Sequence, residues 1–167
     1  MAHFIPATEE HVDLLLKNLR PADRAELEAL LGDEKLWKPA ILAMLGPYHH
    51  LPQEAFAMYA DSGEFAGMCG VFRYNTPDAF KPQVWMLGTP VLEKHQTEFL
   101  RAGRKWVREM ADRHGHISNH VDARNTKAIQ WLRWLGFKFN GSIHCWGVAR
   151  LPFLYFSMIG HKKEECA

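Results

Sequence analysis

The length of this chain, 167 residues, suits one globular domain, and we expect a single domain over residues 1–167. Hydrophobic residues make up 47% of the chain and charged residues 23%, which excludes a disordered protein. The formal net charge of +1 gives no general attraction to nucleic acid or to an anionic membrane, so neither is an expected partner.

The first half of the chain predicts one strand followed by three helices. His3 to Pro6 has the character of a short strand, and Thr8 with the two acidic residues after it opens a helix. Pro21 begins a second helix, which Gly32 ends, and Pro39 begins a third. The residues expected to face the core from these helices are Val12, Leu15, Leu16, Leu19, Leu27, Leu30, Leu31, Ile41, Met44 and Leu45.

Three strands and a long helix are predicted next. Ala55–Ala60 and Phe65–Tyr74 form a hairpin around a turn of Asp, Ser, Gly and Glu, and Val84–Gly88 is a further strand. The segment from about Val91 to His114 has the apolar spacing of the longest helix. We expect it to bury Phe99, Leu100, Trp106, Val107 and Met110 on one face.

The segment from Ile117 to Phe139 has the pattern of a strand, a helix and a second strand. Asn125 is suited to cap the helix, because its side-chain oxygen can accept an unpaired amide of the first turn. Gly136 stands where a helix commonly ends in a left-handed residue. We expect one wide buried face on this helix, including Trp131 and Trp134. The last strands are predicted at Phe137–Asn140 and Phe153–Met158.

The order of these elements, together with four sequence segments, resembles the GNAT superfamily of N-acetyltransferases. The segments are LRPADRAELEAL (Leu19–Leu30), VWMLGT (Val84–Thr89), FLRAGRKWVREM (Phe99–Met110) and NHVDARNTKAIQWLRWLGF (Asn119–Phe137). They are similar to GNAT proteins of tailed phages, the group that includes the internal virion protein A of short-tailed phages. The resemblance implies an α/β fold with a mixed sheet of about six or seven strands flanked by helices.

In the GNAT fold the sheet separates between its fourth and fifth strands, here Val84–Gly88 and His116–Val121. The resemblance implies that acetyl-CoA is the cofactor, with its pantetheine arm in this gap and its pyrophosphate at the start of the long helix. The cofactor-binding residues so implied are Met86, Leu87, Gly88, Thr89, Lys94, His95, Gln96, Thr97, Asn119 and Asn125.

Acyl transfer to an amine requires a base, and His120 and Asp122 are the candidate catalytic residues. They share one parity on the predicted strand, so both side chains can point toward the gap. An unperturbed imidazole has a pKa near ~6.5, which suits proton transfer at neutral pH. Two alternatives remain: His120 as a hydrogen-bonded histidine at a strand end, and Asp122 as part of the cap of the following helix.

Two features depart from the GNAT pattern. The loop that usually contains closely spaced glycines reads PVLEKHQTEFL, and no glycine lies between Gly88 and Gly103. Leu132 stands where many GNAT enzymes have a proton-donating tyrosine. Two functions therefore remain open. One is N-acetyl transfer to a small amine or a protein acceptor. The other is a catalytically degenerate phage protein that binds a host protein or a virion component.

Metal binding and secretion are not expected. The three cysteines, Cys69, Cys145 and Cys166, have no spacing typical of a disulfide framework or a zinc site, and no histidine motif compensates. No segment has the length of a membrane span or the character of a secretion signal. We expect a cytoplasmic protein, in the host cytoplasm or a virion if a phage encodes it. His49 and His50, in a predicted loop, are candidates for acceptor binding or simple solvent exposure.

Overall fold

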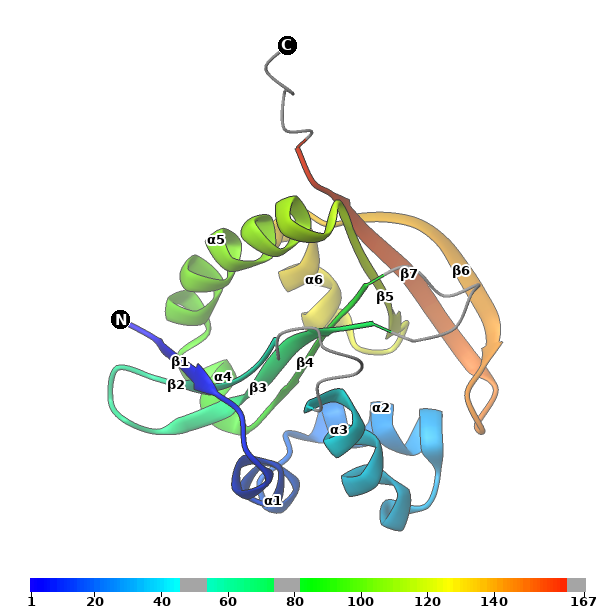
Figure 1. Ribbon diagram of the computed structural model, residues 1–167. Coiled ribbons are helices and arrows are strands. Elements are labelled where there is room, and N and C mark those ends of the chain that lie inside the picture. The colour runs from blue at the N-terminus through cyan, green and yellow to red at the C-terminus, as the bar shows by residue number, and fades with distance from the viewer. Residues whose placement is uncertain (46–53, 74–81, 162–167) are drawn as a thin grey trace.

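The structure is a computed structural model that describes residues 1–45, 54–73 and 82–161. A seven-stranded sheet in the order β1-β2-β3-β4-β5-β7-β6 lies at its centre, with helices on both faces (Figure 1). The strands are β1 His3–Pro6, β2 Ala55–Tyr59, β3 Phe65–Phe72, β4 Gln83–Gly88, β5 His116–Asp122, β6 Lys138–Trp146 and β7 Leu151–Ile159. The helices are α1 Glu9–Lys17, α2 Pro21–Leu31, α3 Trp37–Leu45, α4 Pro90–Lys94, α5 Gln96–His114 and α6 Thr126–Leu135, with a short 3-10 turn at Glu34–Leu36.

Each face of the sheet has its own hydrophobic core. Helices α1, α2 and α3 cover one face, and α5 and α6 cover the other (Figure 1). On the first face, Leu15 and Ile41 pack with Trp85 of β4. On the second face, buried side chains of α5 and α6 such as Val107 and Ile129 pack against the sheet. The predicted α/β class and the order of elements are confirmed.

The start and end of α2 follow the sequence signals. Pro21 is the first residue of the helix, where the missing N–H of proline costs no hydrogen bond. The helix ends at Gly32, whose φ of 72° is a conformation that side chains disfavour. The predicted bounds of this helix are confirmed, which matters because α2 carries residues of the cavity described below.

The long helix predicted from Val91 to His114 is interrupted. The chain forms α4 and α5 instead, and His95 between them has φ −113° and ψ 29°, outside the helical region. The His95 side chain is held by Glu64, 3.1 Å away at the β2–β3 turn. The apolar spacing gives no sign of this break, because Leu92 and Phe99 are both buried and continue one stripe across it. The prediction of one continuous helix was wrong here.

Strands β4 and β5 separate almost as soon as they pair. They are parallel, and their register contains the single pair Gln83 and Ser118. One residue further along, the Asn119 side chain donates from Nδ2 to the Val84 carbonyl oxygen at 2.9 Å, in place of a main-chain bond. On its other side β5 is paired with β7 along its whole length. The separation of the fourth and fifth strands expected from the resemblance is therefore present.

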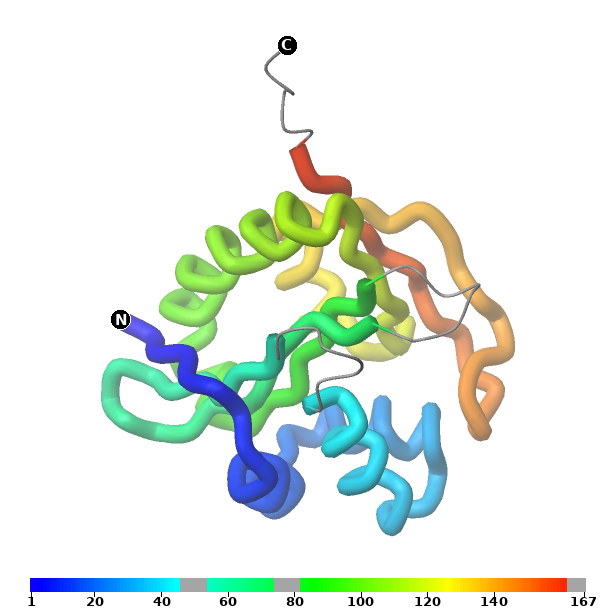
Figure 2. The backbone as a smooth tube through the Cα atoms, viewed as in Figure 1, coloured from blue at the N-terminus to red at the C-terminus, as the bar shows by residue number. Residues whose placement is uncertain are grey.

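The last two strands are longer than predicted. Strand β6 continues well past the predicted end at Asn140, through a polar stretch that contains Gly141 and Ser142. An edge strand of this kind has little apolar alternation, so the sequence gives a weak signal for it. The turn that joins β6 to β7 lies against the end of α2 (Figure 2). There the Val148 and Ala149 amides donate to carbonyl oxygens of α2 at 3.3 and 3.1 Å.

The predicted burial of Trp134 was wrong. Trp131 is 7% exposed, whereas Trp134 is 45% exposed and lies under the Arg104 guanidinium, 4.9 Å from the ring centroid. Side chains advance by about 100° per residue around a helix, so Trp134 lies about 60° beyond Trp131 on the side away from Ala128 and Ile129. The buried arc of α6 is thus narrower than the sequence suggested.

Truncation of Trp131 is expected to destabilise the protein by about 3–5 kcal/mol, because it leaves a cavity between α6 and its neighbours. Trp134→Ala is the matched control, and we expect it to cost under about 1 kcal/mol. Urea denaturation of both variants measures the difference. Equal costs for the two substitutions would contradict the orientation of α6.

Candidate functional site

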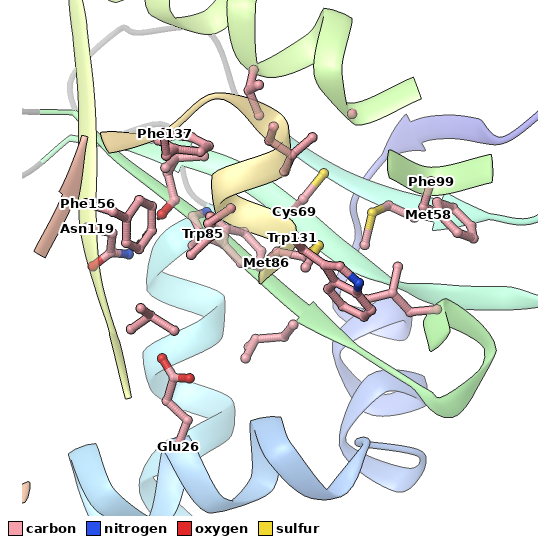
Figure 3. Close-up of a pocket in the computed structure, with 18 of the residues that line it drawn as sticks. Glu26, Met58, Cys69, Trp85, Met86, Phe99, Asn119, Trp131, Phe137 and Phe156 are labelled. Atoms are coloured by element: carbon pink, nitrogen blue, oxygen red, sulfur yellow. Dashed lines mark hydrogen bonds between the residues drawn. The ribbon is translucent and has the colours of Figure 1, made fainter. Parts of the chain in front are cut away.

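An apolar cavity of about 260 Å³ lies where β4 and β5 separate. Its walls come from both faces of the sheet. They include Glu26, Leu27 and Leu30 of α2 on one face, and Phe99 of α5 and Trp131 of α6 on the other. Figure 3 shows Glu26 reaching toward this cavity from α2, with Asn119, Met86 and Trp131 on its other sides. The cavity therefore passes through the sheet at the gap.

The edge of β4 presents backbone groups to this gap at every second residue. The Val84 carbonyl oxygen faces β5, since it accepts from Asn119. The Gly88 N–H also points away from β3, since it donates to Asp23 Oδ2 at 2.6 Å. Met86 lies midway between them, so the alternation of a strand directs its N–H and C=O into the gap. Met86 thus offers one donor and one acceptor to an extended ligand.

The Gly88 end of the gap is closed by an ion pair between Arg20 and Asp23 at the start of α2. Arg20 Nε donates to Asp23 Oδ2 at 2.6 Å, and the Arg20 side chain is 1% exposed. The Arg20 N–H donates to the Gly88 carbonyl oxygen at 2.9 Å. The guanidinium also lies over the Trp131 ring, with 4.8 Å between its central carbon and the ring centroid. This cluster, which we call the Arg20 clamp, joins α2, β4 and α6.

Among the expected cofactor residues on β4 and just after it, Met86 and Leu87 line the cavity. The backbone of Gly88 is instead bound by the Arg20 clamp. Thr89 is buried, and its hydroxyl donates to the Phe65 carbonyl oxygen and accepts the Val91 amide at the start of α4. Gly88 and Thr89 therefore have structural partners.

The remaining expected cofactor residues near the start of α5 are exposed to different degrees. Lys94 and His95 both contact the Glu64 carboxylate, at 3.2 and 3.1 Å. Gln96 lines the cavity and accepts from Trp131 Nε1 at 3.2 Å, while Thr97 is exposed. The N-cap of α5 is His95, whose side chain makes no capping hydrogen bond.

His120 lies in the cavity wall, as expected for a candidate base. Its ring stacks on Trp146, with 5.0 Å between the ring centroids and 23° between the planes, and Tyr155 lies 5.2 Å away. Burial lowers the pKa of the His120 imidazole below its usual value, because the charged form loses solvation. The ring is therefore neutral at pH 7 and can accept a proton.

Asp122 lies on the same strand, but its carboxylate is already bound. It is 2% exposed, accepts the Arg124 amide at 2.8 Å and forms an ion pair with the Arg124 guanidinium at 2.6 Å. This arrangement fixes the turn between β5 and α6. The cap of α6 is Asn125, whose Oδ1 accepts the Ala128 amide at 3.2 Å. The sequence prediction of Asn125 as the N-cap is confirmed.

Asn119 and Asn125 were both implied as cofactor-binding residues. Asn119 lines the cavity, where its side chain holds β5 to β4. Asn125 does not line the cavity itself, but its Nδ2 donates to Oε2 of the cavity residue Glu26 at 3.4 Å. Both side chains thus support the position of other groups around the gap.

Glu26 is a cavity residue that the sequence reasoning missed. Burial raises its pKa most, and the nearby carboxylates of Asp23 and Asp122 also raise it, against the lowering effects of the Asn125 hydrogen bond and the Arg20 charge, so that the pKa is about 7. Such a group changes its charge near neutral pH. The sequence did contain a signal for Glu26. Two acids, Asp23 and Glu26, lie on the apolar face of α2 that also carries Leu27 and Leu30.

Other candidate groups have settled partners or lie elsewhere. Cys69 lines the cavity, but burial raises the pKa of its thiol to about 12, so it is not a nucleophile at neutral pH. His114 is bound between Glu54 and Arg73 at the end of α5. Within residues 1–45, 54–73 and 82–161, no group of three or more His, Cys, Asp or Glu side chains is placed to hold a metal ion. His49, His50 and Cys166 lie outside the described residues.

Comparison with known proteins identifies the architecture. No family model and no curated protein matches the sequence. Solved structures do match. The ribosomal-protein-S18-alanine N-acetyltransferase of Escherichia coli superposes with a TM-score of 0.65 at 12% identity, over 100% of this chain and 99% of that one. The spermidine N-acetyltransferase of Vibrio cholerae in complex with CoA and spermine gives 0.63 at 12% identity, over 95% of each chain. An acetyltransferase structure from Acinetobacter baylyi gives 0.66 at 18% identity, over 99% and 98%.

The chain has the GNAT acetyltransferase fold. None of the helices in the part of the chain that the structure describes is long and apolar enough to cross a membrane.

Removal of the Asp23 carboxylate is expected to cost about 3–5 kcal/mol of stability, because it leaves the Gly88 amide without a partner and the buried Arg20 charge with only the more distant Glu93, at 3.5 Å. The control is Asp13→Ala, which breaks a surface ion pair with Lys38 and should cost at most about 1 kcal/mol. Thermal and urea denaturation of Asp23→Ala measure the loss. A loss of stability near zero in Asp23→Ala would show that the Arg20 clamp does not hold α2 to β4.

Glu26 is expected to make stability fall as the pH rises. Its folded-state pKa of about 7 exceeds the ordinary value of 4.5, so the folded state binds more protons over this interval. The Glu26→Gln variant should therefore gain stability relative to the wild type between about pH 5 and pH 8, with no gain below pH 4.5. Urea midpoints across this range, with the exposed Glu28→Gln as control, test the prediction. A difference in urea midpoint between wild type and Glu26→Gln that stays constant across this pH range would contradict the raised pKa of Glu26.

Proposed function

We propose that the protein is an N-acyltransferase that moves an acetyl group from acetyl-CoA to an amine. The observation that carries the proposal is the apolar cavity through the β4–β5 gap, with His120 in its wall as a neutral base. The fold supports it, because the Vibrio cholerae structure of this fold is a complex with CoA and spermine. Proteins of one fold catalyse different reactions, so the cavity and His120 support the proposal more strongly than the fold does.

The residues present fit an extended thioester arm. Met86 directs its backbone donor and acceptor into the gap, and Met86 and Leu87 line the cavity beside it. The N-terminus of α5, with Lys94 and His95 before it, suits the negative charge of a pyrophosphate, because the helix dipole is positive at this end. Glu64 now contacts Lys94 and His95, so these side chains exchange a carboxylate for a phosphate on binding. When bound, acetyl-CoA supplies an activated acyl thioester.

His120 serves as the base in this proposal. An amine is protonated at neutral pH and must lose a proton before it can attack a carbonyl carbon. The neutral imidazole accepts that proton, and stacking on Trp146 holds the ring in one orientation. Asn119 keeps β5 in place beside it, because its Oδ1 accepts the His120 amide at 2.7 Å. The apolar walls exclude water, which limits competing hydrolysis.

Substitution of His120 by Gln is expected to lower kcat/KM for acetyl transfer by about 10²–10⁴, with little loss of stability. The control is His144→Gln, which changes an exposed histidine of β6 outside the cavity. Release of free thiol from acetyl-CoA in the presence of an amine gives the rate, and calorimetry gives the binding of acetyl-CoA.

The assay also separates the alternative function. Thiol release that survives His120→Gln would remove His120 as the base. No thiol release with any amine, together with no binding of acetyl-CoA at millimolar concentration, would exclude the acyltransferase function. The remaining hypothesis would then be a catalytically inactive protein of this fold that binds a host or virion protein, which capture of a single partner would support.

A further inference from the structure

The end of the cavity beside α2 contains one acid among apolar side chains. Of the described residues that line the cavity, Glu26 alone carries a carboxylate. Leu27 and Leu30 of the same helix line the cavity too, as do Met44 of α3 and Trp146 of β6. A ligand in this cavity therefore meets one carboxylate and several apolar side chains.

The neighbouring acids Asp23 and Asp122 already have cationic partners. Asp23 is paired with Arg20, and Asp122 is paired with Arg124 at 2.6 Å. Burial keeps the His120 imidazole neutral at pH 7, so it does not repel a cation. Glu26 is therefore the group left to neutralise a bound ammonium, which in turn favours its ionised form.

Trp146 forms an aromatic wall that the fold holds in place. Its ring stacks on His120 with 5.0 Å between the centroids. The turn after β6 is bound to α2, because the Val148 amide donates to the Leu30 carbonyl oxygen at 3.3 Å. Gly147 allows the turn to lie close to α2, because a side chain at this position would clash with the Ala29 backbone. Its φ of 68° is also a conformation that favours glycine. Trp146 and Glu26 are thus fixed on two walls of one cavity.

We infer that the acceptor of the reaction is a monoamine whose nitrogen is attached to an aromatic or aliphatic body. The inference rests on the proposed function and names the substrate class of the same site. The ammonium pairs with Glu26, and the body of the molecule contacts Trp146, Leu30 and Met44. A polyamine would place its further charges against these apolar side chains, where an unpaired charge loses its solvation without compensation.

Calorimetry with the full chain, without acetyl-CoA, tests the inference directly. The probes are 2-phenylethylamine, its neutral analogue 2-phenylethanol, hexylamine, spermidine and a short peptide with an N-terminal phenylalanine. We expect 2-phenylethylamine to bind at least about tenfold more tightly than spermidine. The affinity for hexylamine shows whether an aliphatic body binds as well as an aromatic one. The affinity for the peptide shows whether a protein N-terminus binds as well as a free small amine.

Three substitutions assign the contacts. Glu26→Gln should weaken 2-phenylethylamine about tenfold while leaving 2-phenylethanol unchanged, because only the amine carries a charge. Trp146→Ala should weaken both ligands, and Trp146→Phe should restore much of the binding because it retains an aromatic face. Trp134→Ala, a half-exposed tryptophan outside the cavity, is the control and should bind like the wild type. Melting curves establish that each variant is folded.

The outcomes distinguish this inference from the proposed function. Tighter binding of spermidine than of 2-phenylethylamine, or failure of every monoamine to bind, would overturn the acceptor class. Unchanged affinity in both Glu26→Gln and Trp146→Ala would overturn the assigned site. Retained monoamine binding with no thiol release from acetyl-CoA would reject the acyltransferase and leave the amine site standing.

Discussion

The separation of two parallel strands is the constraint on which the rest of this structure depends. Strands β4 and β5 share one ladder position, and beyond it each strand edge carries backbone groups that need partners. The structure supplies these from elsewhere: Asn119 binds the Val84 oxygen, and the Arg20 clamp binds both backbone groups of Gly88. Met86 lies between these two closed positions, which is where a ligand can complete the ladder.

The charges around the gap show a division of roles. Arg20 with Asp23 and Arg124 with Asp122 are local pairs that fix the start of α2 and the turn before α6. Neither acid is available to a ligand, although both influence the site. Their negative charge raises the pKa of Glu26 beyond the effect of burial alone. The carboxylate of a structural ion pair can therefore shift the pKa of a titratable group that it does not touch, because electrostatic interactions are long-ranged where solvent is excluded.

Three elements differ from their sequence patterns for definite physical reasons. His95 interrupts a helical stripe because Glu64, which is 31 residues away, holds its side chain. Trp134 is exposed because the contact arc of α6 ends at Trp131, and a wide aromatic stripe does not show where that arc stops. Strand β6 was underestimated because an edge strand needs no apolar alternation. In each case a tertiary contact overrode or replaced the local pattern.

The sequence by itself determined the α/β order of elements, the proline start and glycine end of α2, and the asparagine cap of α6. These follow from backbone chemistry and side-chain periodicity, which act over a few residues. The tertiary structure alone decided that Glu26 and Trp146, 120 residues apart, line one cavity with His120. It also decided that Asp122 is bound to Arg124 rather than open to a ligand. Those outcomes depend on how α2, β5 and the β6–β7 turn pack together, and packing between distant segments leaves no periodic trace in the chain.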